Sequence, residues 1–334
     1  MILAVTHPAD EHARPVLEAL ARLGAEAVVL DLSELPRRGR LALGYGASRA
    51  GRIELDGRPP VDADRIRAVW WRRARRMVAA EGLSIDRADF SVRQANDALM
   101  GLIASLGRQA LLVNDPWREA GASYKTGQLA AAERSGLLVP RTLVTSDPGE
   151  ARAFLDALGG SAAIHKAVHA TPADWRRTRR IAPEDLQHLD ALRFSTVILQ
   201  EHVPGVDVRV TVVGESIFAA EIDARSSSSP DDYRGHEPEC RIEPCPLPAA
   251  EERALRMLVR DLGLQFAAVD FRRRDDGAWF FLELNPAGQW DFVEERTGQP
   301  ITEALAGLLA SAGVPEAEPA AARYSPGISP SPNR

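Results

Sequence analysis

Runs of hydrophobic residues alternate with amphipathic stretches over the first third of the chain. The apolar run at 1–7 predicts a buried strand, the periodic stretch at 11–24 predicts a helix that ends at Gly24, and 25–35 predicts a second strand. The alternation continues with a strand in RIRAVWWRRARR, a helix over 88–108 and a short strand in ALLVND. This order is typical of half of a doubly wound α/β sheet. Because no glycine-rich turn follows the first strand, we do not expect a dinucleotide site there.

The rest of the chain mixes helical periodicity with hairpin patterns. One hairpin is predicted to turn near Gly214 and a second through RDDG. Asp147 precedes Pro148 and is expected to cap a helix that ends at paired glycines. In chain order we expect a helix over 123–137, strands over 139–148, 161–168 and 195–205, a hairpin over 206–224, a helix over 249–263, a hairpin over 265–285 and a helix over 300–313. The tail at 317–334 is rich in Pro, Ala and Ser and is expected to be disordered.

Composition narrows the class of protein. The 334 residues are 45% hydrophobic, enough for a sizeable core, and the net charge of −6 does not favour nucleic acid as a partner. No run approaches the ~20 apolar residues of a membrane span, and the apolar start is too short for a signal peptide. We therefore expect a cytoplasmic protein without a membrane partner, in which Cys240 and Cys245 are ordinary thiols.

Acidic and amide side chains interrupt an otherwise apolar hairpin near the C-terminus. Glu283 and Asn285 share one face of the strand FFLELN, because side chains alternate along a strand, and Asp270 ends the neighbouring strand FAAVD. Burying an unpaired carboxylate is costly, so this face either is solvated or holds a cation. Three hard oxygen donors suit Mg²⁺, whose remaining ligands are water and phosphate oxygens. The residues alone leave both alternatives open.

Two lysines strengthen the interpretation as a cation and phosphate site. Lys166 lies inside the apolar strand AAIHKAV, where an ammonium group needs an anionic partner, and Lys125 opens a helix. A lysine that reaches solvent from a strand edge is the alternative. The strand VILQEHVPG can offer backbone groups to an adenine edge, with Glu201 near a ribose. Asp207 and Arg209 share a strand face, and a guanidinium there suits a terminal or acyl phosphate.

These motifs, in this order, resemble those of the ATP-grasp superfamily over residues 113–312. The combination is most similar to the graspetide synthetases, maturases of microviridin-type peptides. AVWWRR is similar to a VWYRR strand of that group, and further similar segments are LLVNDPWREAGASYKTGQL, DDYR, RVTVVGESIFAAEI and LELNPAGQWDFVEERTGQPI. Each segment is weakly specific alone, whereas the combination is specific.

The resemblance implies an α/β (α+β) ATP-grasp fold with an N-terminal Rossmann-like pre-ATP-grasp domain. It implies ATP and two Mg²⁺ ions as cofactors, with the ions bound by Asp270, Glu283 and Asn285 and bridged by Glu283. The other implied site residues are Lys125 and Lys166 at the phosphates, Gln200, Glu201, His202, Val203 and Asp207 at the nucleotide, Arg209 at the transferring group, and Arg209, Arg234 and Arg272 at the substrate. An internal ion pair or a surface position is the alternative for Arg234 and Arg272.

The resemblance also implies a division of the chain and an activity. We expect a pre-ATP-grasp domain over 1–118, a central subdomain with a lid over 119–204, a C-terminal subdomain with the metal site over 205–313, and a disordered tail over 314–334. The implied activity is ATP-dependent macrocyclisation of a precursor peptide that carries a leader segment, by a homodimer. An amide ligase of the ribosomal-protein glutamate ligase type is the alternative, and a catalytically dead nucleotide-binding module is a third hypothesis, which the complete acidic set disfavours.

Two departures from the family pattern concern the lid. The family strand usually continues Lys-Pro-Leu, whereas this chain has HKAVHA, and residues 168–182 contain no glycine. The basic sequence WRRTRR at 175–180 is expected to close over ATP or to guide an acidic core peptide, and a solvated helix end is the alternative. The lid of this chain is therefore expected to differ from that of the family.

Overall fold

The fold is described from a computed structural model over residues 1–46, 50–107, 109–159, 163–168, 178–228, 233–234 and 236–312. The predicted tail at 317–334 and residues 175–177 of the basic sequence WRRTRR lie outside these residues.

The N-terminal part forms a four-stranded parallel sheet, ordered β2-β1-β6-β7. Its elements are β1 (Ile2–Val5), α1 (Ala13–Arg22), β2 (Ala27–Leu30), β6 (Ala68–Trp71), α2 (Ile85–Leu106) and β7 (Leu111–Val113). Every residue of β1 is buried, as its continuous apolar run predicts for a central parallel strand. The predicted strand–helix–strand order is confirmed, although the second strand ends at Leu30, where Asp31 caps a short 3-10 helix (Leu32–Glu34).

A small antiparallel sheet in the same region was not predicted. It consists of β3 (Gly39–Gly44), β4 (Ala50–Leu55) and β5 (Val61–Asp62), followed by a 3-10 helix (Ala63–Arg65). Leu35 and Leu55 pack so closely over Gly39 that a Cβ there would lie 2.4 Å from a Leu35 methyl carbon. The strands are short and their apolar positions are few, so their pattern alone is weak.

The central part is an antiparallel sheet ordered β10-β9-β11-β8, covered by one α-helix. The elements are β8 (Thr142–Thr145), α5 (Pro148–Leu158), β9 (Ala163–Ala167), β10 (Arg179–Arg180), a 3-10 helix (Pro183–Phe194) and β11 (Val197–Glu201). Asp147 accepts hydrogen bonds from the backbone N–H of Gly149 at 2.7 Å and Glu150 at 3.0 Å, which confirms the predicted cap.

The C-terminal part is a five-stranded antiparallel sheet ordered β14-β13-β12-β15-β16. Its strands are β12 (Val206–Val213), β13 (Ser216–Asp223), β14 (Arg241–Pro244), β15 (Phe266–Arg273) and β16 (Trp279–Asn285), with a 3-10 helix (Glu237–Glu239) before β14. Its helices, and those that connect to it, are α3 (Pro116–Ala122), α4 (Lys125–Arg134), α6 (Ala249–Leu262), α7 (Asp291–Thr297) and α8 (Ile301–Ser311). Both predicted hairpins are confirmed; α3, α7 and β14 were not predicted.

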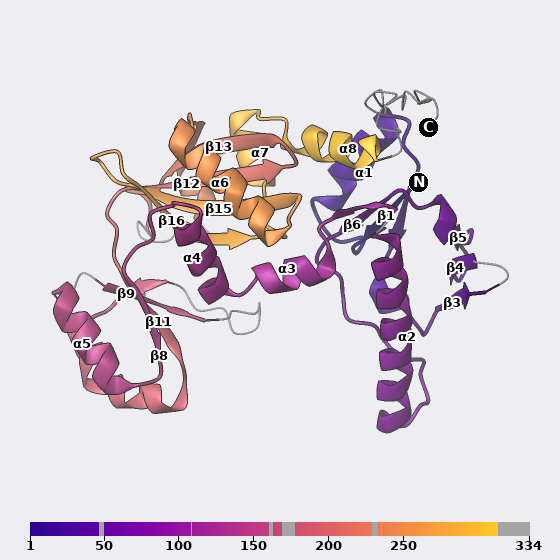
Figure 1. The fold of residues 1–334 in the computed structure, drawn as a ribbon, viewed down its shortest axis with the longest axis horizontal. Coiled ribbons are helices and arrows are strands. Elements are labelled where there is room, and N and C mark those ends of the chain that lie inside the picture. Colours follow the sequence, from indigo (N-terminus) through magenta and orange to yellow (C-terminus); the bar gives the residue numbers. More distant parts are fainter. Residues whose placement is uncertain are drawn as a thin grey trace, which may run out of the picture.

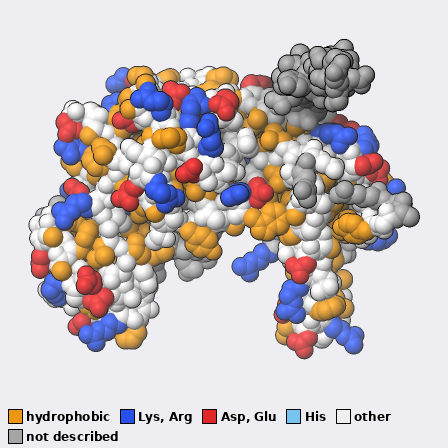
Figure 2. Space-filling model, in the orientation of Figure 1, with side chains coloured by type: hydrophobic (Ala, Val, Ile, Leu, Met, Phe, Trp, Pro, Cys, Tyr) orange, Lys and Arg blue, Asp and Glu red, His pale blue; other side chains and the backbone are white. Residues whose placement is uncertain are grey.

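The three parts form separate lobes (Figure 1), of which the N-terminal and C-terminal ones share a hydrophobic core while the central one has its own. Helix α8 packs against α1, so that Leu305 and Leu309 join Val16 and Leu20 in one hydrophobic cluster. On the face in Figure 2, acidic and basic side chains are interspersed, and α2 projects from the body. Among the described helices, none combines the length and apolar character that crossing a bilayer requires.

Candidate active site

Two carboxylates face each other across the β15–β16 hairpin. Asp270 pairs with Glu283 in the strand register, and Asn285 lies opposite Ala268, two residues further along. A bulge between Asp270 and Phe271 shifts the register there, and bulges commonly redirect a side chain next to a site. The strand period therefore places both carboxylates on one face, as the sequence predicts.

Cations surround this acidic pair. Glu283 lies 3.1 Å from the Lys125 ammonium nitrogen and 3.2 Å from an Arg234 guanidinium nitrogen. Asp270 lies 3.0 Å from Arg209, and the Tyr233 hydroxyl donates to the same carboxylate oxygen at 3.2 Å. Helix α4 presents Lys125 at its first residue, and β12, paired with β15, places Arg209 directly opposite Asp270.

The charges of the pair are set by burial and by these partners. Burial alone would raise the pKa of Glu283, but Lys125, Arg234 and Lys166 together lower it to about 2. Burial raises the pKa of Asp270 above its usual value, because Arg209 only partly offsets the burial and the charge on Glu283 adds to it. At neutral pH, Glu283 is therefore a carboxylate.

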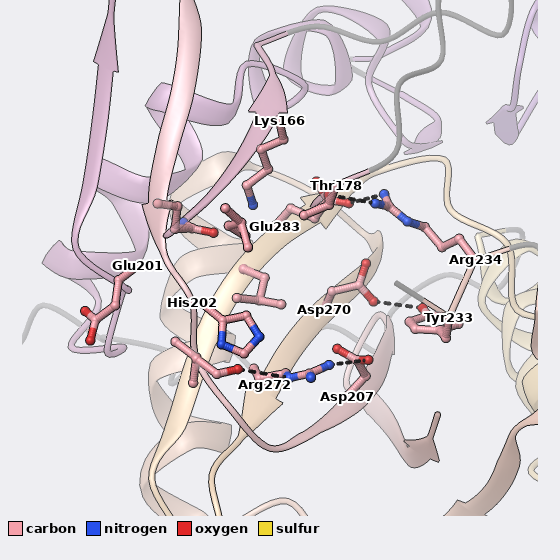
Figure 3. A pocket seen from close by; sticks show the side chains of 14 residues that line it. Lys166, Thr178, Glu201, His202, Asp207, Tyr233, Arg234, Asp270, Arg272 and Glu283 are labelled. Atoms are coloured by element: carbon pink, nitrogen blue, oxygen red, sulfur yellow. Dashed lines mark hydrogen bonds and ion pairs between the residues drawn. The ribbon is translucent and has the colours of Figure 1, made fainter. Parts of the chain in front are cut away.

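Lys166 extends from β9 toward Glu283 in Figure 3. Its residue is 9% exposed, and burial lowers its pKa to about 8, with Glu283 acting in the opposite direction. An ammonium group in this position is poorly solvated, so an anion that enters beside it is stabilised more than it would be at the surface.

Two cavities meet at the acidic pair. The lysine cavity, shown in Figure 3, is lined by Ile164, Lys166, Thr178, Gln200, Glu201, His202, Val203, Asp207, Tyr233, Arg234, Asp270, Arg272, Leu282 and Glu283. The arginine cavity is lined by Arg73, Arg209, Tyr233, Arg234, Glu237, Asp270, Glu283, Asn285, Gln289 and Phe292. Tyr233, Arg234, Asp270 and Glu283 line both, so the carboxylates form part of a shared wall.

The strand β11 and the residues after it form one side of the lysine cavity. Gln200 is 1% exposed, and its side-chain amide nitrogen donates to the Thr142 hydroxyl at 2.9 Å. The oxygen of the same side-chain amide is buried and lacks a hydrogen-bond partner. The Glu201 carboxylate turns outward in Figure 3 and accepts from the Arg141 backbone N–H at 3.4 Å. His202 lies 3.2 Å from Arg180. The expected ribose contact of Glu201 stays a prediction.

Arg272 lies on the lysine side of the site. It bonds Asp207 at 2.6 Å and the Val203 carbonyl at 3.2 Å. The sequence predicts a substrate role for Arg272 and a nucleotide role for Asp207, and both roles stay predictions. Of the expected substrate residues, Arg209 and Arg234 line the arginine cavity.

Several lining residues were not predicted from the sequence. They are Tyr233, Thr178, Gln289, Phe292 and Arg73. Thr178 accepts a hydrogen bond from Arg234 at 3.2 Å (Figure 3). Tyr233 precedes Arg234 in DDYR, and Arg73 belongs to the basic sequence WWRRARR, so both stood beside residues that the sequence singled out.

The loop after β16 is held by the N-terminal lobe. The Asn114 amide donates to the Pro286 carbonyl at 2.8 Å, and Arg72 donates to the Gly288 carbonyl at 3.2 Å. Gly288 lies against β15, where a Cβ would come within 2.4 Å of the Ala268 Cβ. Since this loop directly follows Asn285, the N-terminal lobe fixes the end of the acidic hairpin.

The donor set fits a hard divalent cation. Asp270, Glu283 and Asn285 all line the arginine cavity and offer oxygen atoms only. Among the residues described, no group of three or more His, Cys, Asp or Glu side chains is placed to hold a metal, and the third oxygen donor beside this pair of carboxylates is the Asn285 amide. The Asn285 oxygen already accepts from the Ala287 N–H at 3.0 Å, which orients it.

Comparisons with known proteins bear on the fold and on the class of activity. Residues 1–119 match the family model of the MvdD pre-ATP grasp domain. The fold is similar to that of the macrocyclase MdnC from Microcystis aeruginosa MRC, solved with the precursor peptide MdnA; the two are 26% identical, with 92% of this chain and 98% of that chain covered and a TM-score of 0.78.

Two further proteins are similar to the chain. The ATP-grasp ligase PsnB, solved with a phosphomimetic variant of its minimal precursor, Mg and ADP, is 26% identical, with 93% of this chain and 98% of that chain covered and a TM-score of 0.76. A probable alpha-L-glutamate ligase of Pseudoalteromonas translucida (strain TAC 125) is 24% identical over 201 residues, which are 57% of this chain and 64% of that protein. The expected ATP-grasp fold, its pre-ATP-grasp domain and the resemblance to peptide macrocyclases are confirmed.

Proposed function

We propose that this chain, an ATP-grasp protein by its fold, closes rings in a ribosomally made precursor peptide at the expense of ATP. One observation carries the proposal: the carboxylates of Asp270 and Glu283 lie in the wall between a cavity with a buried lysine and a cavity with three arginines. A triphosphate and an acidic side chain are both anions, and they can approach each other only where positive charge lies between or beside them.

In this proposal, the lysine cavity binds ATP. Lys166 and Lys125 contact its phosphates, and the backbone of residues 200–203 contacts adenine. The side-chain amide oxygen of Gln200 is buried and lacks a hydrogen-bond donor. Such an oxygen is costly to leave without a donor, which supports a ligand on this side of the cavity. Asp270, Glu283 and Asn285 would hold Mg²⁺, and the family resemblance implies two ions. Bound Mg²⁺ would offset the negative charge of the phosphates and of the acyl phosphate oxygens.

The arginine cavity then binds the peptide. An Asp or Glu side chain attacks the terminal phosphorus of ATP, giving an acyl phosphate and ADP, and Arg209 stabilises the charge that develops. A Ser or Thr hydroxyl, or a Lys amine, of the same peptide then attacks the acyl carbon and releases phosphate, and its proton passes to solvent. Each ester or amide ring therefore removes one water from the peptide overall.

The relatives support this activity over the alternative. MdnC and PsnB cover almost the whole of this chain and were solved with precursor peptides, whereas the glutamate ligase matches 57% of it. From the family resemblance, we propose that the peptide carries a leader segment that binds away from the chemistry. We further propose that the enzyme acts as a homodimer in the cytoplasm, where ATP is available.

Mass spectrometry of a candidate precursor tests the proposal. A short peptide encoded beside the gene and rich in Thr, Asp and Glu is incubated with the enzyme, ATP and Mg²⁺, and with the Asp270→Asn and Glu283→Gln variants. We expect stepwise loss of the mass of one water per ring, reduced at least about 100-fold in rate in each variant. Gain of the mass of a glutamyl residue would instead support the amide ligase, and water loss that persists in both variants would contradict the assigned site.

A further inference from the structure

Arg73 has a backbone conformation that its residue type disfavours. Its φ is +45°, and it is the one residue other than glycine with a positive φ in the described ranges. In this region the Cβ of an L-residue crowds the following carbonyl, so glycine is the favoured occupant. Strained non-glycine residues persist where the surrounding structure enforces them, and they concentrate at functional sites.

The two neighbouring arginines at this turn differ in burial and in their surroundings. Arg72 continues the sheet, since its N–H donates to the Val5 carbonyl at 3.0 Å, and its side chain is 2% exposed. Its guanidinium lies 2.9 Å from Asp10 and 4.6 Å from the centre of the Trp290 ring. Arg73, the next residue, is exposed and lines the arginine cavity. The positive φ therefore lies where the chain passes from the buried Arg72 to a residue of the cavity wall.

The contacts of Arg73 differ in kind from those of the other two arginines in the cavity. Arg209 and Arg234 are ion-paired with Asp270 and Glu283 at 3.0 and 3.2 Å. The Arg73 Nε donates to the neutral carbonyl of Ala287 at 3.4 Å. A guanidinium has five donor hydrogens, and this bond uses one of them, on the atom nearest the chain. The planar outer edge, which suits a carboxylate, is not engaged by that bond.

A purely structural role for Arg73 would duplicate contacts already present. Arg72 reaches the carbonyls of Ala287 and Gly288, at 3.5 and 3.2 Å, and Asn114 bonds that of Pro286. The loop is therefore held at three successive carbonyls without Arg73. A strained, exposed arginine is not needed for that purpose.

We propose that Arg73 is a substrate-binding residue, contributed by the N-terminal lobe, that binds a carboxylate of the acidic peptide from the wall of the arginine cavity. This inference rests on the proposed function, because it takes the peptide to be the occupant of that cavity. It assigns the N-terminal lobe a direct part in choosing acidic substrates. Arg72 is, by contrast, a positioning residue that acts through the loop at 286–290.

Steady-state kinetics on the precursor that the enzyme cyclises test the inference. Arg73→Gln is compared with Arg76→Gln, which removes the same charge from the same segment at an exposed residue outside the arginine cavity. We expect the peptide KM to rise about 10- to 100-fold in Arg73→Gln, the loss of one charge-assisted contact, with the KM for ATP unchanged. Arg76→Gln should match the wild type, and Arg73→Lys should recover part of the affinity.

Arg73→Gly separates binding from folding. Glycine relieves the positive φ, so the melting temperature should equal or exceed that of the wild type while the peptide KM still rises. A fall in melting temperature with kcat and both KM values changing together would show that Arg73 is a structural anchor and would overturn the inference. A peptide KM equal to that of the wild type would overturn this inference and leave the proposed function intact. A wild-type enzyme that closes no ring would refute the proposed function and this inference together.

Discussion

Single charged side chains, held away from water, set the properties of the site. Lys166 is the clearest case, because burial lowers its pKa to about 8. The folded protein then binds this proton less tightly than the unfolded chain does, so between about pH 8 and the usual lysine pKa of about 10.4 the unfolded state holds more protons. By itself, Lys166 therefore makes the folded state gain stability as pH rises through that window.

Nucleotide binding should show the opposite pH dependence at Lys166. Phosphate oxygens favour the ammonium form, so ADP with Mg²⁺ should bind with proton uptake above about pH 8, and its affinity should fall by up to about tenfold per pH unit there. Isothermal titration calorimetry across this range, in buffers of different ionisation enthalpy, measures both quantities. The Lys166→Arg variant, which stays charged, serves as control. An equal pH slope in that variant would contradict the role of Lys166.

Site residues that lie on one strand can be predicted from the sequence, because their spacing shows that they share a face. Site residues that come from other segments of the chain cannot. Glu283 and Asn285 could be placed on one face because the strand period is two. Tyr233 could not, since it reaches Asp270 from a segment 37 residues away. The outward turn of the Glu201 carboxylate likewise depends on Arg141 of another segment, which no local pattern shows.

The Asn114 side chain joins two elements by bonding their backbone groups. Its amide donates to the carbonyls of Phe266 and Pro286 at 2.9 and 2.8 Å, and its oxygen accepts from the N–H groups of Gln265 and Phe266 at 2.8 and 2.9 Å. One buried side chain thus fixes the start of β15 and the loop after β16.

Replacing Asn114 by Ala should be strongly destabilising. Four buried backbone groups would lose their partner, and we expect the free energy of unfolding to fall by about 2–4 kcal/mol. Urea titration followed by circular dichroism measures it. Asn96→Ala, at an exposed position of α2, should change it by less than about 0.5 kcal/mol. Equal midpoints for both variants would show that the hydrogen bonds of Asn114 do not stabilise the fold.

Elements with long or strictly periodic patterns could be predicted, and short ones could not. The hairpins β12–β13 and β15–β16 and the helices α1, α2, α5, α6 and α8 follow from period and caps. The sheet β3–β5 has strands as short as Val61–Asp62, and α3 and α7 span two turns each (Pro116–Ala122 and Asp291–Thr297), too short for an apolar face to repeat. Their places are set by tertiary contacts, β3 with α2, α3 with α4 and α6, and α7 with β14.

At the scale of the whole molecule, two sheets build the lysine cavity. The central sheet supplies Lys166 and Gln200, and the C-terminal sheet supplies Asp270, Arg272 and Glu283. A ligand in this cavity contacts both sheets, so it stabilises their relative position as well as each sheet. Contacts between lobes join residues that are far apart in the sequence; Arg72 and Gly288, for example, are 216 residues apart. Local sequence patterns do not reveal such contacts.

Ligand and metal should therefore stabilise the molecule together. At a concentration about 100 times its Kd, ADP with Mg²⁺ should add about 2.7 kcal/mol to the free energy of unfolding and raise the melting temperature. Differential scanning fluorimetry with ADP alone, ADP with Mg²⁺, and both with excess EDTA measures the dependence. We expect EDTA to abolish most of the shift. A shift from ADP that is the same with and without EDTA would contradict the assignment of Asp270 and Glu283 to a metal.

In the proposed function, the donor and the acceptor of the phosphoryl group occupy two cavities that have only Tyr233, Arg234, Asp270 and Glu283 in common among their lining residues. Neither ligand has to leave before the other can be exchanged, so spent nucleotide can be replaced while the peptide stays in place. In kinetic terms the arrangement permits random order of addition and several turnovers in one encounter. A substrate with many acidic side chains could then acquire its rings processively, in an order set by the peptide rather than by repeated rebinding.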